Sequence, residues 1–457
     1  MGETYCPKLR LLLACCLVLG ACNSISTVTS NVLSSAELFE PPGSGSFQGT
    51  GGMTQARFAG AAARMVSGPM AGRILVAGGL TGAGSSTAEA EVYDPATGTF
   101  TPVGSMKYPR AYFTATPLSD GTVLMVGGIN SNAGTVAVLG IAELFNPSTG
   151  EFETLTSTLP SAVWQHVAVP FCAQESSGTY SYQRVTPSGC PSGYEIYVFI
   201  AGGFVNSSGS VVTPQVLVYE PTSQTFAAAT PLPSPPSSTI APGLAAAAAE
   251  AIPQPATSTA PDIVVFGGQL SNGSSSDFAF VYGLAGSTTS PLTGTWTSGS
   301  VLSVPRTNPT ATTLVNEPAS GAACEGYTII TGGVDSASGV VSNTADIYAP
   351  ASTEGQVGTL RGTATMSTIR IHHTSTEIGL SDNSVPNAGD VLIAGGTGLN
   401  GSSLSSAELF VPAGSGSTCT GSFVATGSMT TARSYQTATA LRDGTGRVLI
   451  AGGADNP

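Results

Sequence analysis

The chain of 457 residues has little charge, almost no lysine and few tryptophans. Charged residues make up 9% of it, against roughly a quarter in ordinary globular proteins. Lys8 and Lys107 are the only lysines, and 14 basic residues stand against 27 acidic ones. Such a chain is not expected to bind nucleic acid through its phosphates. Intrinsic disorder is also disfavoured, because disordered chains combine high net charge with few apolar residues.

The N-terminus has the pattern of an export signal. Lys8 and Arg10 precede the apolar stretch 11–19, which is too short to span a bilayer, and no later stretch is as long as a membrane helix requires. The segment Leu19-Gly20-Ala21-Cys22 resembles the lipobox of bacterial lipoproteins. This resemblance implies cleavage before Cys22 and lipid attachment to its thiol. An ordinary cleaved signal peptide is the alternative.

These features divide the chain and predict its location. We expect a lipoprotein signal peptide at residues 1–21, a lipid-anchored linker at 22–33 and one folded domain at 34–457. Asn23 stands where an aspartate would, in the enterobacterial sorting pattern, retain a lipoprotein at the inner membrane. The resemblance therefore implies attachment to a membrane of the bacterial envelope, with the outer membrane favoured.

The remainder of the chain repeats one motif seven times. A short apolar run such as Ile74-Leu75-Val76-Ala77 ends in a Gly–Gly pair, and a loop rich in Ser, Gly and Asn follows. An aliphatic–aromatic step such as Val92-Tyr93 and a further bulky residue such as Phe100 complete the unit. Each unit therefore predicts four short strands separated by turns. The pairs are Gly78-Gly79, Gly127-Gly128, Gly202-Gly203, Gly267-Gly268, Gly332-Gly333, Gly395-Gly396 and Gly452-Gly453.

The two ends of the domain supply complementary halves of a unit. The N-terminal part contains only the third and fourth strands, and the C-terminal part only the first and second. Pairing them closes a ring without exposed sheet edges. We therefore predict an all-β, seven-bladed propeller of four-stranded antiparallel blades. The double glycine, the spaced tyrosine and the spaced aromatic residue resemble the kelch repeat over about residues 34–453, which implies this fold but says little about function.

Five units place an arginine at one repeat position and an acid at another. The same two units, those with Gly202 and Gly267, lack both charges. Joint loss favours structural Arg–carboxylate pairs, because a buried charge without its partner is costly. The alternative is a basic ring that binds an anionic ligand at the mouth of the central channel. The arginines are Arg57, Arg110, Arg306, Arg370 and Arg433, and the acids are Glu37, Glu91, Glu143, Asp346 and Glu408.

The three histidines do not predict a metal site. His166 and His373 occupy one repeat position, which Gly60 and Gln436 fill in other units. His372 and His373 are adjacent, so on a strand their side chains would point to opposite faces. Galactose oxidase has a related propeller, but its copper site needs two histidines and two tyrosines in a set that we do not find here. We expect neither a metal nor a cofactor.

Four cysteines remain after Cys22 in an exported chain, which predicts two disulfides. Counting alone allows three pairings. Cys172 and Cys190 bracket an insertion between the first two strands of one unit, so they can join to each other. Cys324 and Cys419 lie in connections on the same side of neighbouring units, which favours a second bridge between them.

The ligand is expected to be a glycan or another envelope protein, bound by a monomer that acts as a binding or scaffolding module. Loops after the Gly–Gly pairs are rich in amides and hydroxyls that can hydrogen-bond a sugar. The two units without the charge pair add Trp164, His166 and the Pro-rich segment 231–242, and this break in the repeat is where we expect a site. The alternative is a carbohydrate-active enzyme such as a sugar mutarotase, because bacterial kelch propellers include one.

Overall fold

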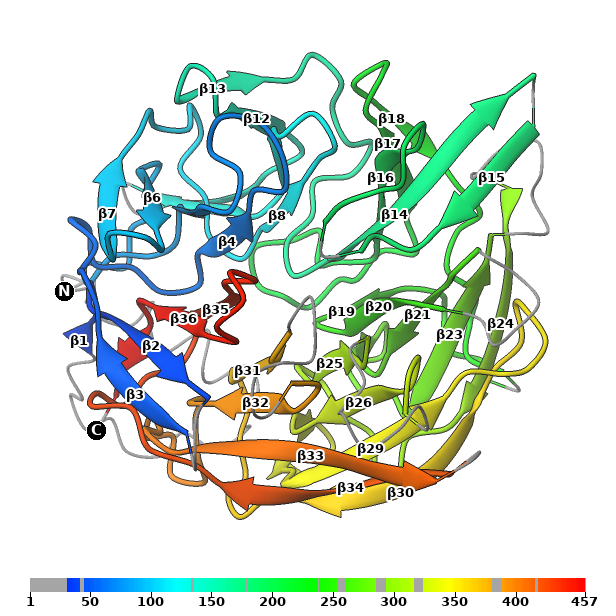
Figure 1. The fold of residues 1–457 in the computed structure, drawn as a ribbon. Helices are drawn as coiled ribbons and strands as arrows, with labels where there is room; N and C mark the ends of the chain where they lie inside the picture. The colour runs from blue at the N-terminus through cyan, green and yellow to red at the C-terminus, as the bar shows by residue number, and fades with distance from the viewer. Residues whose placement is uncertain are drawn as a thin grey trace, which may run out of the picture.

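The computed structural model describes residues 31–41, 45–132, 135–177, 179–186, 188–236, 238–253, 260–284, 293–315, 324–379, 388–415 and 418–456. The predicted signal peptide and Cys22 lie outside these residues. The described chain is all-β, and it contains no helix long and apolar enough to cross a membrane. Its sheets form a ring of blades around a central axis (Figure 1).

Six blades are built from consecutive strands in antiparallel order. The first blade comprises β4 (Ala61–Arg64), β5 (Ile74–Ala77), β6 (Ala90–Asp94) and β7 (Thr99–Pro102), and the second β8 (Thr114–Pro117), β9 (Val123–Val126), β12 (Ala142–Asn146) and β13 (Glu151–Thr154). The third comprises β14 (Val167–Ser176), β16 (Glu195–Ala201), β17 (Val216–Glu220) and β18 (Thr225–Ala228), with β15 (Thr179–Gln183) added beside β14.

The next three blades repeat this order. The fourth comprises β20 (Ala248–Ile252), β21 (Asp262–Phe266), β23 (Phe278–Gly283) and β24 (Thr295–Ser300). The fifth comprises β25 (Thr310–Thr313), β26 (Thr328–Thr331), β29 (Thr344–Ala349) and β30 (Thr359–Thr365). The sixth comprises β31 (Thr374–Glu377), β32 (Val391–Ala394), β33 (Ala407–Ser415) and β34 (Thr418–Ala425).

The seventh blade joins the two ends of the domain, as predicted. C-terminal strands β35 (Thr437–Ala440) and β36 (Val448–Ala451) pair with N-terminal strands β2 (Ala36–Glu40) and β3 (Ser46–Gly49) in the order β3-β2-β36-β35. In addition β1 (Asn31–Val32) pairs with β37 (Ala454–Asp455). Sheet contacts therefore begin at Asn31, inside the segment that the sequence assigned to the linker.

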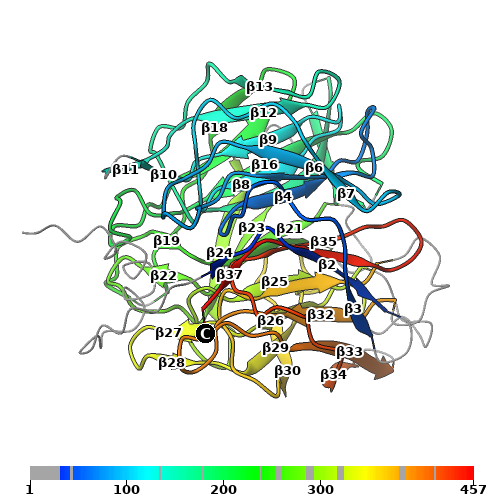
Figure 2. The same cartoon turned by 90° about the vertical axis from the view of Figure 1, so that its left-hand side faces the viewer.

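One face of the ring is formed by the loops that follow the seven Gly–Gly pairs, and we call it the Gly–Gly face. It includes the β1–β37 ladder and three further short ladders (Figure 2). These are β10 (Ile129–Asn132) with β11 (Thr135–Val138), β19 (Leu244–Ala245) with β22 (Gln269–Leu270), and β27 (Val334–Asp335) with β28 (Val340–Val341). The central channel opens on this face at the starts of the innermost strands.

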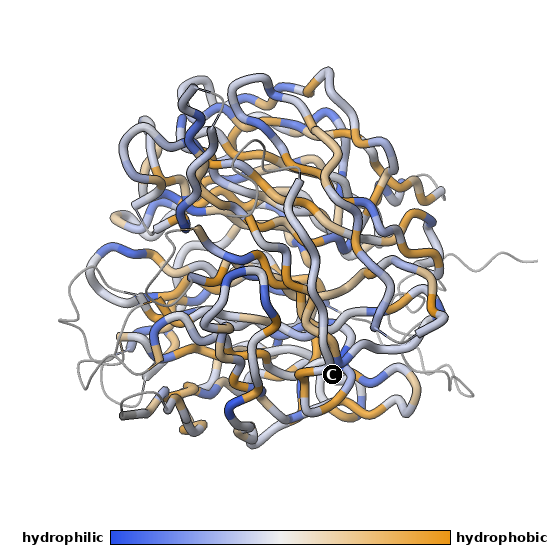
Figure 3. The backbone as a smooth tube through the Cα atoms, turned by 90° about the vertical axis from the view of Figure 1, so that its right-hand side faces the viewer, coloured by the Kyte–Doolittle hydropathy of each residue, from blue (hydrophilic) through white to orange (hydrophobic). Residues whose placement is uncertain are grey.

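The core lies between adjacent blades, and apolar residues concentrate in the strands rather than in the loops (Figure 3). The aromatic residue of each aliphatic–aromatic step is at most 1% exposed. In six blades its ring lies 4.9–5.4 Å from the ring of the next strand. In the fifth blade Leu360 takes that place opposite Tyr348. Such pairs add to the burial energy of the strands.

The Gly–Gly pairs connect each blade to the next. All fourteen glycines have positive φ, which side chains rarely tolerate. A Cβ on the first glycine of each pair would lie 2.2–2.6 Å from a carbonyl oxygen of the next blade. The second glycine donates its N–H to the same carbonyl at 2.7–3.2 Å, and the bond from Gly453 to Arg57 closes the circle. Glycine is therefore required twice, for conformation and for close approach.

Candidate functional site

The five arginines form buried ion pairs with the five acids, each within its own blade. The pairs are Arg57–Glu91 at 3.1 Å, Arg110–Glu143 at 2.6 Å, Arg306–Asp346 at 2.8 Å, Arg370–Glu408 at 3.0 Å and Arg433–Glu37 at 2.7 Å. Each side chain in them is at most 5% exposed. This is the arrangement that joint loss of the two charges predicted.

Backbone groups complete the hydrogen bonding of each pair. In the second blade Arg110 Nη1 donates to the carbonyls of Gly127 and Ile141, while Glu143 accepts from the N–H groups of Lys107 and Tyr108. The other four arginines bond their own Gly–Gly strand in the same way. Burial lowers the pKa of all five guanidinium groups, and the partner carboxylate opposes that effect. These groups therefore serve the fold.

The third and fourth blades replace the ion pair with an apolar pair. Val163 and Leu217 occupy the arginine and acid positions of the third blade and belong to one buried cluster. Leu244 and Phe280 do so in the fourth blade, again within one cluster. In the third blade the Gln215 side chain accepts from Ser161 N at 2.9 Å, which replaces a bond that a carboxylate makes elsewhere.

Trp164 and His166, named from the sequence as possible ligand contacts, have different surroundings. Trp164 is buried, donates its indole N–H to the Asn206 carbonyl at 2.9 Å and packs on Phe204 at 5.0 Å. It belongs to the apolar layer under the Gly–Gly face. His166 lies in the wall of the central channel.

A ring of seven residues surrounds the channel mouth, one from each blade. Each stands two residues after the arginine position and adopts the left-handed conformation, with φ between 50° and 56°. Six backbone hydrogen bonds of 2.8–3.2 Å link neighbouring members. The mouth is therefore held by the backbone, which leaves the side chains free to vary. The members are Ala59, Tyr112, Gln165, Ala246, Asn308, His372 and Tyr435.

These residues line a cavity of about 280 Å³. The following position adds further groups in six of the seven blades, among them His166, Pro309, His373 and Gln436. The lining contains aromatic rings, amides and a threonine, but no acid, lysine or arginine. The five paired arginines are not part of it. The cavity is close to the lower size limit of pockets that bind small ligands.

The histidines of the cavity wall are neutral at pH 7. Burial lowers the pKa of His166 to about 4 and that of His372 to about 3, and it lowers the pKa of His373 as well. His373 Nε2 lies 2.9 Å from Thr331 Oγ1 and His166 Nε2 lies 3.0 Å from Thr114 Oγ1. His372 and His373 immediately precede β31, and their side chains contact opposite neighbouring blades. His373 Nε2 lies near Thr331 of the fifth blade and His372 Nε2 near Tyr435 of the seventh, and both residues line the cavity.

Aromatic contacts define one side of the cavity. The His372 and Tyr435 rings stack at 3.9 Å, and Tyr435 Oη lies 3.0 Å from His372 Nε2. Tyr112 stands edge-on to Tyr435 at 6.0 Å. Within the described chain, His372 Nδ1 and Gln436 Oε1 have no hydrogen-bond partner although both atoms are buried.

The comparisons with known proteins concern the fold. A model of the kelch motif matches residues 62–107, which cover most of the first blade. A solved structure titled "Structure of YjhT" covers 80% of this chain and 97% of its own, with a TM-score of 0.50 and 15% identity. No curated protein matches the sequence. The motif match identifies one kelch motif in the first blade, and the solved structure shows the same type of fold.

The chain is a seven-bladed β-propeller that contains a kelch motif at residues 62–107. Its two disulfides have the predicted pairing, Cys172–Cys190 and Cys324–Cys419. The first fixes the insertion of the third blade, and the second connects the fifth blade to the sixth. Both lie on the side of the propeller opposite the Gly–Gly face.

Charged side chains gather at the opposite end of the channel. Arg442 forms an ion pair with buried Glu377 at 3.3 Å, and Arg184 of the third-blade insertion interacts electrostatically with Glu377 and Glu250. Burial, together with the charge of Glu377, raises the pKa of Glu250 to about 8. Among the described residues no group of three His, Cys, Asp or Glu is placed to hold a metal.

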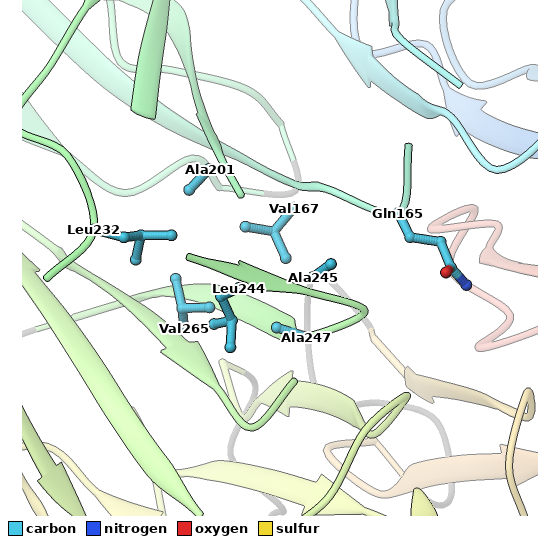
Figure 4. Close-up of a pocket in the computed structure, with 8 residues that line it drawn as sticks. All are labelled: Gln165, Val167, Ala201, Leu232, Leu244, Ala245, Ala247 and Val265. Carbon is cyan, nitrogen blue, oxygen red and sulfur yellow. The ribbon is translucent and has the colours of Figure 1, made fainter. Parts of the chain in front are cut away.

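An apolar gap separates the third and fourth blades of the propeller. Val167, Ala201, Leu232, Leu244 and Val265 surround it (Figure 4). It is too narrow to admit a water molecule. The two blades without ion pairs therefore meet at an interface of aliphatic side chains, and the channel-mouth cavity is the better candidate site.

Proposed function

We propose that this propeller is a lipid-anchored binding module of the bacterial envelope, and that its ligand is an uncharged sugar held at the channel mouth. One observation carries the proposal. The cavity combines the rings of Tyr112, His372 and Tyr435 with the amides of Asn308 and Gln436. Aromatic faces suit the apolar side of a sugar ring, and amides donate and accept bonds to its hydroxyls.

The charge distribution favours a neutral ligand. The nearest positive charges, the ring of arginines, already donate to carboxylates and backbone carbonyls. The wall histidines are neutral, and the chain carries a net charge of −13. An anionic sugar would lose its hydration in the cavity without gaining an ion pair.

Calorimetry on the mature, disulfide-bonded protein with neutral sugars and their uronate counterparts tests this proposal. We expect neutral sugars to bind more tightly than uronates. Asn308→Asp keeps the side-chain shape but places a charge in the cavity, so it should weaken binding by about tenfold or more. Asn272→Asp, in an exposed loop of the same face, is the matched control and should bind as the wild type does.

Other outcomes would identify another ligand. Binding of uronates that weakens with salt and is lost in Arg57→Ala would support the arginine ring instead. Absence of binding across the sugars would favour an envelope protein as partner, with the loops near Trp164 and residues 231–236 as the first surface to crosslink.

A sugar-modifying enzyme, such as a mutarotase, is the second candidate, and Glu250 favours it. Its raised pKa keeps it protonated near neutral pH, as a general acid requires, and Arg184 lies near it in the channel. Polarimetry on fresh sugar solutions would detect the activity. Glu250→Gln should abolish the mutarotase activity. Asn308→Asp instead tests the sugar cavity at the Gly–Gly end of the channel.

A further inference from the structure

Exposed apolar side chains are concentrated on the Gly–Gly face. Four large apolar residues of the described chain are classed as exposed, and three of them lie in loops after Gly–Gly pairs. They are Leu399 of the sixth blade, 76% exposed, Val340 of the fifth, 61%, and Val211 of the third, 51%. The fourth, Val424, belongs to β34 at the outer edge of its blade.

This face also has very little charge. The loops between the Gly–Gly pairs and the next blade strands contain no lysine or arginine, and their acids are Glu89, Asp277, Asp335 and Asp455. The opposite side carries Arg64, Arg442 and Arg447 around its channel mouth. The two faces therefore suit different surroundings.

The N-terminal chain enters the domain at the Gly–Gly face. Asn31 pairs with Asp455, and Leu33 N donates to the Gly453 carbonyl. Eight residues separate Asn31 from Cys22, so an extended chain spans at most about 30 Å between them. A globular domain of this length is about 60 Å across. A lipid on Cys22 therefore holds this face toward the bilayer, because the tether is too short to reach around the domain.

We propose that the Gly–Gly face docks on the lipid surface, with Leu399 and Val340 in contact with the bilayer beside the anchored chain. This inference rests on the lipid anchor of the proposed function. The loops after the Gly–Gly pairs supply no basic residue, and Lys107 in the β7–β8 connection is the lysine of this face, so the contact does not depend on anionic lipid. Few side chains contact the bilayer, so the face alone binds it weakly. The lipid anchor keeps the face close to the bilayer and thereby raises its effective concentration there. The sugar cavity then opens toward the membrane.

Tryptophan fluorescence of the lipidated full chain in phosphatidylcholine vesicles tests the docking. Leu399→Trp should show a blue-shifted emission and several-fold stronger quenching by brominated lipids than Val424→Trp, which is the matched control. Trp164 and Trp296 contribute the same background to both variants. Val340→Trp should behave like Leu399→Trp, and salt at about 0.5 M should leave the quenching unchanged.

Three results would overturn the inference, and they differ from one another. Equal quenching of Leu399→Trp and Val424→Trp on vesicles that retain the protein would exclude docking while the anchor stands. A blue shift of Leu399→Trp that grows with protein concentration without vesicles would assign the face to a second copy. If the wild-type protein fails to float with vesicles, as Cys22→Ser is expected to fail, the chain has no lipid anchor. That result would contradict both the proposed anchor and the docking.

Discussion

The second and third blades are neighbours with the same strand order but different interiors. In the second, Arg110 and Glu143 form a buried ion pair whose remaining bonds go to the backbone. In the third, Val163 and Leu217 fill the same places. The Gly–Gly pairs of both blades donate to the next blade at the same repeat position. The ring geometry therefore requires the backbone bonds and a filled interior, but it does not require the charges.

The comparison also shows how a blade can exchange a buried ion pair for a buried apolar pair. A single loss leaves a buried charge, which costs more than the pair contributes, whereas an apolar pair of similar volume is often neutral or stabilising. The third blade makes a further adjustment, because Gln215 bonds the backbone of Ser161. Replacing the ion pair without loss of stability therefore requires both charged residues to change and a new acceptor for the backbone N–H.

The largest expected effect comes from breaking one pair. Arg110→Val should lower the free energy of unfolding by about 3–5 kcal/mol, because Glu143 is then buried without a counter-charge. Denaturant titration with oxidised disulfides measures the change. Arg447→Val is the control, since Arg447 pairs with Asp443 at partly exposed positions, and it should cost about 1 kcal/mol or less. Equal losses would contradict a structural role for the buried pair.

Placing the three corresponding residues of the third blade in the second blade should restore most of the free energy of unfolding that Arg110→Val loses. Arg110→Val, Glu143→Leu and Ile141→Gln together reproduce Val163, Leu217 and Gln215. We expect the triple variant to lie within about 2 kcal/mol of the wild type in the same titration. The variant without Ile141→Gln should be less stable by about 1 kcal/mol, since a buried N–H loses its acceptor. A triple variant as unstable as Arg110→Val would show that the blades are not equivalent.

The smallest effect concerns the fourth blade, where Glu250 has no ion pair within 4 Å among the described residues. Its pKa is raised from 4.5 to about 8, so between these values the folded state keeps a proton that the unfolded state has lost. Stability should therefore fall as pH rises from about 5 to 8, because the unfolded state gains the charged form of Glu250 first. Glu250→Gln should remove this part of the slope in thermal unfolding.

Asp390, whose pKa burial raises to about 7, gives a slope of the same sign that remains in Glu250→Gln. Asp390→Asn in addition should flatten the curve further. Parallel pH curves for the wild type and Glu250→Gln would mean that Glu250 is not desolvated in the channel.

Much of the fold could be predicted because short sequence patterns in each repeat mark where its strands begin and end. A Gly–Gly pair marks the end of each second strand, and an aliphatic–aromatic step such as Val92-Tyr93 marks the third. The complementary half-units at the two ends predicted the shared seventh blade, which β2, β3, β35 and β36 form. The joint absence of charges in two units predicted the ion pairs, and the topology of the connections predicted both disulfides.

The cavity could not be predicted in the same way. Tyr112, Asn308, His372 and Tyr435 occupy one repeat position with three different residue types, so the repeat pattern does not mark them. The available signal was their fixed place, two residues after the arginine position, where the backbone turns left-handed. Trp164 was named because it belongs to a unit without the charge pair, and it is buried under the Gly–Gly face. The export signal and Cys22 remain predictions, because they lie outside the described residues.

The sequence by itself determined the number of blades, the closure of the ring and the pairing of its charges. These depend on residue types that backbone geometry or burial requires, such as glycine at positive φ and a carboxylate for each buried arginine. Tertiary structure alone decided which variable side chains meet at the channel mouth. Seven residues from blades far apart in the chain converge there because the ring closes, and no local pattern records that convergence.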